Sequence, residues 1–118
     1  MNLEEDFERV ATLDEILPGN LRGIEVDGFD LVLGNVEGEI YAVGGVCSHE
    51  GSELRMGRLE GTKLTCFAHQ WSYDIRTGVP IWPPISRVAP GYRLRIYPVR
   101  IEGNEVFVSK KPGRRGLQ

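Results

Sequence analysis

The sequence predicts an all-β fold in one domain. Fifteen glycines and seven prolines are spread through the 118 residues and divide them into short segments, which argues against long helices. Turn signals separate nearly all of these segments, as they do in chains of antiparallel hairpins. Several short strands at this spacing are typical of a sandwich or a barrel.

Eight segments are expected to form strands. They are Phe7 to Thr12, Leu21 to Val26, Asp30 to Val36, Ile40 to Val46, Arg58 to Thr65, Trp71 to Asp74, Tyr92 to Arg100 and Glu105 to Ser109. Four dipeptides have residues that tolerate positive φ in tight hairpin turns, namely Asp27-Gly28, Glu37-Gly38, Glu60-Gly61 and Gly103-Asn104. Leu13 to Leu17 can form a helical turn, but five residues cannot carry a fold.

Three segments interrupt the strand pattern. Cys47 to Gly57 and Cys66 to Gln70 break hydrophobic runs with cysteine, histidine and small polar residues, so we interpret them as hairpin loops. The third segment, Pro80 to Pro90, contains Trp82-Pro83-Pro84. Because proline has no amide hydrogen for a sheet ladder, this segment cannot be a central strand and is expected to be a rigid loop.

Nothing in the sequence indicates a second domain. There is no internal repeat, low-complexity tract or linker, so we expect one domain at residues 1–109 and a disordered tail at residues 110–118. No run approaches the roughly 18 apolar residues of a membrane span, and the acidic start MNLEEDFERV is unlike a signal peptide. We therefore expect a cytoplasmic protein that does not enter a membrane.

The charge of the chain is unevenly distributed. The tail holds four of the 14 basic residues, so residues 1–109 carry ten basic against 17 acidic residues, a net charge of −7. An acidic surface repels nucleic acid and steers the protein toward basic partners. We interpret the KKPGRR run of the tail as a solvated chain end.

All cysteines and histidines of the chain belong to one pattern. Cys47-Ser48-His49 is followed, after sixteen residues, by Cys66-Phe67-Ala68-His69, and no cysteine or histidine is left over. Two cysteines in a reducing cytoplasm favour metal binding over a disulfide. Since thiolate and neutral imidazole suit iron and zinc, the pattern predicts one metal site at the tips of two hairpins.

Two metal centres are compatible with these four ligands. A Cys2His2 set can close a tetrahedral zinc site, but zinc motifs usually separate paired ligands by two to four residues, whereas Ser48 alone separates the first pair. A two-iron cluster removes this difficulty if Cys47 and Cys66 bind one iron while the two histidines bind the other. The spacing therefore favours iron without excluding structural zinc.

The same residues resemble the C-x-H…C-x-x-H signature of Rieske proteins. The likeness extends over about residues 7–109, because GEIYAVGGVCSHEG, LRMGRLEG, WSYDIRTG and RIYPVRIEGNEVFV are similar to Rieske ferredoxins of multicomponent oxygenases. The resemblance implies a Rieske iron-sulfur fold, with an antiparallel β-sandwich base and a small cluster-binding subdomain of two hairpin loops. It also implies one [2Fe-2S] cluster held by Cys47, His49, Cys66 and His69, and a third, proline-containing loop that corresponds to Pro80 to Pro90.

The resemblance also indicates the surroundings of the cluster. Ser52 and Ala68 stand where respiratory Rieske proteins have a disulfide, and Trp71 stands where they have a serine that donates a hydrogen bond to cluster sulfur. Losing that hydroxyl should lower the reduction potential, although Tyr73 can retain part of the effect. Electrons are expected to leave through His49 or His69 at a tip that includes Glu50, Glu53, Arg55, Gln70, Trp71, Trp82 and Pro83.

The function implied by the resemblance is electron transfer. No spare histidine, Ser-His-Asp set or phosphate-binding loop is visible, so the chain should be a monomeric carrier, not an enzyme. Its partners would be a flavin-dependent NAD(P)H reductase and the terminal component of a hydrocarbon oxygenase. Gln70 favours a diiron monooxygenase, because ring-hydroxylating dioxygenase ferredoxins usually have glycine there, whereas IRTG and Pro83-Pro84 are at home in dioxygenase ferredoxins too, so both systems remain open. A nitrite reductase subunit and a regulatory or structural metal-binding domain are the alternatives.

Overall fold

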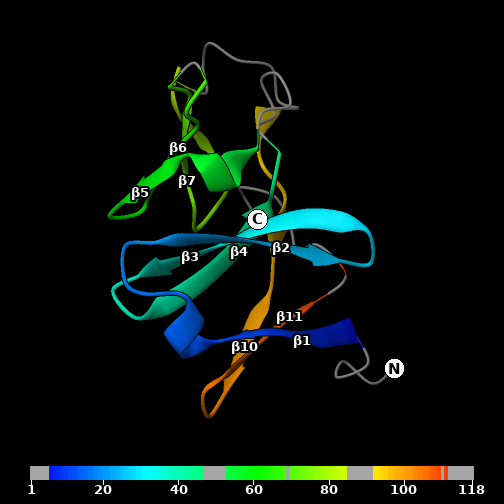
Figure 1. Cartoon of the computed structure of the whole chain (residues 1–118). Coiled ribbons are helices and arrows are strands. Elements are labelled where there is room, and N and C mark those ends of the chain that lie inside the picture. Colours follow the sequence, from blue (N-terminus) through cyan, green and yellow to red (C-terminus); the bar gives the residue numbers. More distant parts are fainter. Residues whose placement is uncertain (1–5, 47–52, 69, 85–91, 110, 112–118) are drawn as a thin grey trace.

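The computed structural model describes residues 6–46, 53–68, 70–84, 92–109 and 111. Within these ranges, eleven short strands form three antiparallel sheets (Figure 1). Two 3-10 turns, η2 (Leu13–Glu15) and η3 (Leu54–Met56), are the helical elements of the described chain. No helix among the described residues is long and apolar enough to cross a membrane.

The base of the molecule consists of two sheets. One has the strand order β1 (Phe7–Thr12), β11 (Glu105–Ser109) and β10 (Val99–Glu102), so that the first and last strands of the chain pair with each other. The other has the order β2 (Leu21–Val26), β3 (Phe29–Val36), β4 (Glu39–Gly44) and β9 (Ile96–Tyr97). Between them lies a core that includes Leu31, Leu33, Ala42, Val106 and Val108. This is the expected antiparallel sandwich base.

The third sheet forms a smaller unit above the base (Figure 1). Its order is β5 (Arg58–Glu60), β6 (Lys63–Thr65), β7 (Ser72–Asp74) and β8 (Pro80–Trp82). A second core joins this unit to the base and includes Val32, Val43, Leu54, Leu64 and Tyr73. Because neighbouring residues of a strand face opposite ways, β3 places Leu31 and Leu33 in one core and Val32 in the other.

The hairpin turns confirm the expected turn residues. Asp27 and Glu37 have φ of 52° and 51°, and each precedes a glycine with positive φ. Gly61 and Gly103 also have positive φ, at 59° and 62°. These left-handed conformations connect β2 to β3, β3 to β4, β5 to β6 and β10 to β11, as the sequence predicts for tight hairpins.

Three predicted segments differ from the structure in their bounds or in their type. The segment from Arg58 to Thr65 is two strands, because Gly61 makes a turn in its middle. The segment from Tyr92 to Arg100 divides at Pro98 into β9 and the start of β10. Pro80–Trp82, expected to be loop, forms β8, which pairs with β7 alone among the described strands. An edge strand tolerates proline because only one side of it joins the ladder.

Candidate metal centre

The second expected ligand loop connects β6 to β7 and begins at Cys66, directly after Thr65. The Cys66 amide donates to the Trp71 carbonyl at 2.7 Å, and the Gln70 amide donates to the Cys66 carbonyl at 3.1 Å. These two bonds close the loop at its base. The interpretation of residues 66–70 as a hairpin loop is therefore confirmed, although His69 itself lies outside the described residues.

Gln70 holds the end of this loop in a left-handed conformation. Its φ is 62°, and its side-chain amide donates to the Phe67 carbonyl at 3.3 Å. The guanidinium of Arg58 on β5 donates to Gln70 Oε1 at 3.2 Å. Because left-handed backbone favours glycine, these side-chain contacts offset part of the strain at a residue that has a Cβ.

The floor of the loop is apolar. Cys66 is 1% exposed and belongs to the same core as Leu54, Leu64 and Tyr73, each of which has no exposed surface. Ala68 is partly buried against this core. Tyr73, on β7, is the expected hydrogen-bond donor of the site, and it shares this core with Cys66. The residues that surround Cys66 therefore exclude water from it.

The first expected ligand loop has a well-defined neck. Val46 and Glu53 form an antiparallel bridge, and the Leu54 amide donates to the Gly45 carbonyl at 2.9 Å. The Gly45 amide in turn donates to the Asp30 carbonyl at 2.8 Å, which ties the neck to β3. The ends of this loop therefore meet over the same core as Cys66. Its own residues Cys47, His49 and Glu50 lie outside the described residues.

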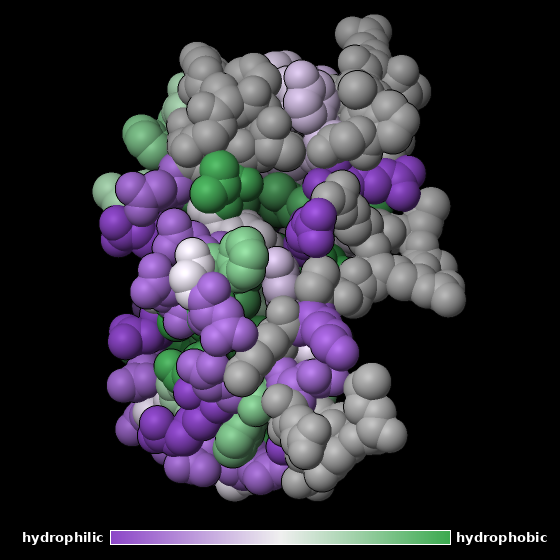
Figure 2. All heavy atoms as spheres, turned by 90° about the vertical axis from the view of Figure 1, so that its right-hand side faces the viewer, coloured by the Kyte–Doolittle hydropathy of each residue, from purple (hydrophilic) through white to green (hydrophobic). Residues whose placement is uncertain are grey.

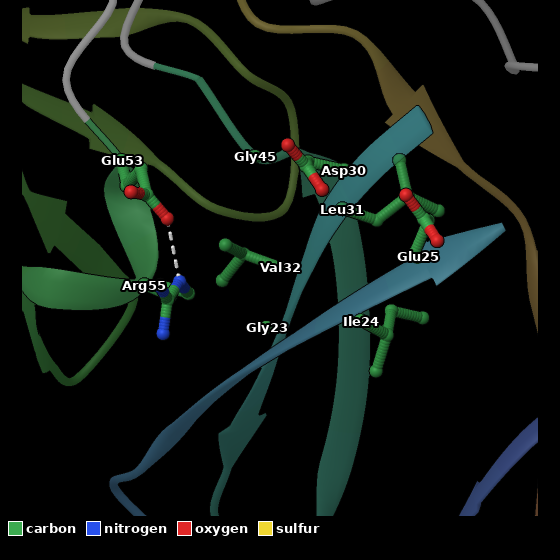
Figure 3. Close-up of a pocket in the computed structure, with 9 residues that line it drawn as sticks. All are labelled: Gly23, Ile24, Glu25, Asp30, Leu31, Val32, Gly45, Glu53 and Arg55. Carbon is green, nitrogen blue, oxygen red and sulfur yellow. Dashed lines mark hydrogen bonds and ion pairs between the residues drawn. The ribbon is translucent and has the colours of Figure 1, made fainter. Parts of the chain in front are cut away.

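A pocket of about 310 Å³ lies beside this neck (Figure 3). It is bounded by β2, β3 and η3, and its charged residues are Glu25, Asp30, Glu53 and Arg55. Arg55 Nε donates to Glu53 Oε1 at 2.7 Å across its rim. The described residues that line this pocket include no cysteine or histidine.

Four aromatic side chains lie in or beside the second and third segments of the expected site. Trp71 and Tyr92 meet edge to face, with ring centroids 5.3 Å apart. Trp82 is 56% exposed and Phe67 is 53% exposed, and the Trp82–Pro83 peptide bond is cis. Trp71 and Trp82 were expected near the cluster. Phe67 and Tyr92 were missed, although Phe67 sits between Cys66 and His69 in the sequence and that position already indicates its exposure at the tip.

The carboxylate of Asp74, at the end of β7, has a lowered pKa. Arg76 donates to both carboxylate oxygens of Asp74, at 3.0 and 2.8 Å, and the Arg76 amide donates to Oδ1 at 2.9 Å. These bonds hold the pKa of Asp74 below its usual value, although partial burial opposes the shift. The bonds stabilise the turn that leads to β8.

Cys66 is the one expected cluster ligand among the described residues, and its surroundings fit an iron-sulfur cluster. Among residues 6–46, 53–68, 70–84, 92–109 and 111, no group of three or more metal-binding side chains comes together. Cys47, His49 and His69 fall outside these ranges. Cys66, a soft thiolate donor in a dry apolar setting at the end of a closed hairpin loop, suits a cluster iron.

Comparison with known proteins shows which family this chain resembles. Residues 6–98 match the model of the Rieske [2Fe-2S] domain. The chain is 37% identical over 102 residues to the ferredoxin component of a naphthalene 1,2-dioxygenase system from Pseudomonas putida, covering 86% of this chain and 92% of the relative. It is 29% identical over 115 residues to the ferredoxin component of an alkene monooxygenase system from Xanthobacter autotrophicus, covering 94% and 89%.

A solved structure shares the fold. A chain of the complex of reduced oxygenase and oxidized ferredoxin in carbazole 1,9a-dioxygenase superimposes with a TM-score of 0.80 at 23% identity, covering 97% of this chain and 100% of that one. The match extends through both the sandwich base and the smaller sheet. With the family model covering most of its length, this chain belongs to the Rieske [2Fe-2S] domain family.

Proposed function

We propose that this chain is the ferredoxin of a multicomponent oxygenase, a carrier that takes up one electron and passes it on without catalysing the oxygenation. The family match over residues 6–98 carries this proposal, because it covers the loop in which Cys66 is buried. Relatives that align over most of their length are ferredoxin components of oxygenase systems. A Rieske-type [2Fe-2S] cluster supplies the one-electron chemistry.

We propose Cys47, His49, Cys66 and His69 as the ligands of this cluster. Support for Cys66 comes from its burial and from the hydrogen bonds that close its loop. Support for the first pair comes from the neck at Val46 and Glu53, which brings the ends of the first loop onto the core that contains Cys66. In this arrangement the protein fixes two ligands from each loop, and its apolar floor keeps water from the cluster.

The proposed partners are a flavin-dependent NAD(P)H reductase and a terminal oxygenase component. A ring-hydroxylating dioxygenase is the better-supported acceptor, because identity is 37% to the naphthalene dioxygenase relative and 29% to the alkene monooxygenase relative. Gln70 does not favour a monooxygenase in this structure. Its φ of 62° is a left-handed conformation that glycine adopts readily, so glutamine here has the same backbone as the glycine usual in dioxygenase ferredoxins. The carrier is proposed to work in the cytoplasm as a monomer when free.

Ligand variants test this proposal. Cys47→Ser and Cys66→Ser should abolish cluster assembly, and His49→Ala and His69→Ala should leave at most an unstable cluster. Iron and acid-labile sulfide are measured on each purified variant, together with visible absorption, because an iron-sulfur cluster is coloured and a zinc site is not. Full two-iron content in the Cys47 variant contradicts the ligand set.

Electron transfer is tested separately with the intact protein. The wild-type ferredoxin should be reduced by a flavin-dependent reductase and should then reduce a ring-hydroxylating oxygenase component within one reaction mixture. Thr62→Ala, at the turn between β5 and β6, serves as a control with an intact ligand set. A protein that assembles its cluster but exchanges electrons with neither component contradicts the proposed carrier role.

A further inference from the structure

A groove of about 350 Å³ lies between the β2–β3 turn and the chain that leads into β9. Its walls come from three stretches of sequence, and its lining residues include Phe29, Asp30, Val46, Arg93, Arg95 and Tyr97. The Gly44 amide donates to the Arg95 carbonyl at 3.0 Å, so the arginine-bearing wall is bonded to the end of β4. A backbone hydrogen bond therefore fixes this wall of the groove to β4.

The two arginines of this groove, like Arg22 on β2, have no carboxylate partner among the described residues, whereas most described arginines have one. Five described arginines form ion pairs with carboxylates of this chain, namely Arg9, Arg55, Arg58, Arg76 and Arg100. Arg93 and Arg95 form no ion pair with any described residue, and Arg93 Nε is buried without an acceptor. A guanidinium stays charged at all physiological pH values. Both side chains therefore retain unused capacity for an anion.

The charge of the groove is opposite to that of the body. Among the described residues that line it, Asp30 is the single acidic one, and its carboxylate forms no ion pair with either arginine. Residues 1–109 as a whole carry a net charge of −7. An acidic partner surface would be repelled by most of this protein and attracted at the groove, which gives the contact a preferred orientation.

The rim of the groove is apolar. Phe29 is 66% exposed and Val46 is 46% exposed. The β2–β3 turn points to the right in Figure 1, and Figure 2, which views the molecule from that side, shows hydrophobic surface between hydrophilic areas. Aromatic and arginine side chains together are the residues that most often carry binding energy at protein interfaces.

The groove is lined by residues that flank the proposed site segments in the sequence. Val46 is the residue before Cys47, and Arg93 and Arg95 follow the third segment of the site. Resting on the carrier function proposed above, we propose that this groove binds a carboxylate-bearing surface of the oxygenase component while the cluster tip faces its electron acceptor. Acidic side chains of that partner bind Arg93 and Arg95, and an apolar side chain covers Phe29.

Binding measurements with the oxygenase component test this interface. Arg95→Gln, Arg93→Gln and Phe29→Ala should each weaken the complex about five- to tenfold by isothermal titration calorimetry, and the effect of the two arginine variants should shrink at high salt. Arg9→Gln is the matched control, because Arg9 is an exposed arginine that is paired with Glu105 on the base. Cluster content is checked by iron analysis, and Arg95→Gln, at an exposed residue, remains informative if Arg93→Gln fails to fold.

A second measurement does not depend on electron transfer. Tetraglutamate is titrated into the 15N-labelled holoprotein, and the Nε–Hε resonances of the arginines are followed. The signals of Arg93 and Arg95 should shift, whereas that of Arg9 should not. Equal responses at all three arginines, or unchanged oxygenase affinity in all three groove variants, overturn the groove proposal. If the wild type transfers no electrons, the carrier function fails, and the peptide titration alone then decides the groove.

Discussion

The side chain of Arg55 lies directly against the backbone of Gly23. A Cβ built at Gly23 would lie 2.5 Å from Cδ of Arg55 and 3.2 Å from its Cβ (Figure 3). Gly23 is in the middle of β2, and Arg55 is in η3, which follows the neck of the first loop. The missing side chain of Gly23 thus lets the base sheet contact the smaller subdomain at the point where the first loop ends.

Gly23→Ala should lower the free energy of unfolding by about 1–2 kcal/mol, because the new methyl group displaces Arg55. Adding Arg55→Ala should recover part of this loss, since the double variant no longer has the side chain that the methyl group meets. Urea unfolding of the four proteins, followed by circular dichroism, measures this coupling. Additive effects of the two substitutions would show that the contact is not specific.

Gly57→Ala should be more damaging than Gly23→Ala. A Cβ at Gly57 would lie 2.0 Å from the Thr65 carbonyl oxygen, and a backbone atom next to Cys66 cannot move aside as a side chain can. We expect a loss of about 3 kcal/mol or more, together with reduced iron content.

Gly61→Ala is the control for Gly57→Ala. Gly61 has a φ of 59° but nothing within 4 Å of its built Cβ, so that variant should lose only about 1 kcal/mol to backbone strain and should keep its iron. Iron analysis and urea unfolding are measured on both variants. Equal losses in the two would contradict the backbone clash at Thr65.

Tyr73→Phe should lower the reduction potential. Tyr73 is fully buried in the same core as Cys66, and a hydroxyl that donates to a ligand sulfur stabilises the more negative, reduced cluster. Redox titration monitored by electron paramagnetic resonance measures the change, and the wild type itself should lie toward the lower end of the roughly −150 to +300 mV range of Rieske centres. Tyr41→Phe is the control, because its hydroxyl donates to Glu39. An unchanged midpoint in Tyr73→Phe would mean that its hydroxyl does not reach the cluster.

The Asp74–Arg76 pair should make stability depend on acidic pH. Because the folded-state pKa of Asp74 is lowered, first by its side-chain bonds to Arg76, the pair stabilises the fold above the usual carboxyl pKa, and this contribution is lost as the pH falls through the lowered value. Asp74→Asn should therefore cost about 1 kcal/mol at neutral pH and less at acidic pH, below the lowered pKa of Asp74. Urea unfolding across this range is the measurement, with Asp30→Asn as control. A loss of unfolding free energy that does not change with pH would show that Asp74→Asn acts through packing and not through the ion pair.

Trp82→Ala should slow reduction of the oxygenase at every salt concentration. Trp82 is 56% exposed at the end of β8, where apolar contact with a partner is insensitive to screening. Glu53→Lys should instead change the rate mainly at low salt, because Glu53 is an exposed charge that acts through long-range attraction, and Glu50→Lys, at a residue outside the described ranges, is expected to do the same.

Stopped-flow mixing measures these rates, and Ile101→Ala is the control because Ile101 is 41% exposed on β10 of the base. Unaltered rates in the Trp82, Glu50 and Glu53 variants, with clusters intact, would show that partners dock elsewhere.

Local signals in the sequence predicted most of the fold. Paired turn residues such as Asp27-Gly28 located the hairpins, because positive φ is a property of single residues. The division of the last long strand could have been read from Pro98, which lacks an amide hydrogen for the ladder. The β8 strand could not, since whether Pro80 stands at a sheet edge depends on which strands pair with it.

The candidate site was predictable from its motif, but its surroundings were not. The ligand spacing pointed to the loop at Cys66, whose closure the structure confirms, while the other three expected ligands lie outside the described residues. The burial of Cys66 in a core with Val32 and Val43, and the contact of Trp71 with Tyr92, join residues that are distant in the sequence. The groove at Arg93 and Arg95 depends likewise on the pairing of β4 with the chain before β9.

The alternating side chains of β3 have a consequence for cooperativity. Leu31 and Leu33 are part of the core shared with β11, and Val32 is part of the core shared with the smaller sheet. Strand β3 thus contributes side chains to both cores. If β3 unfolds with one core, the other core loses contacts as well. Loss of the cluster should therefore destabilise even the distant β1–β11 pair. The whole protein should unfold in a single transition.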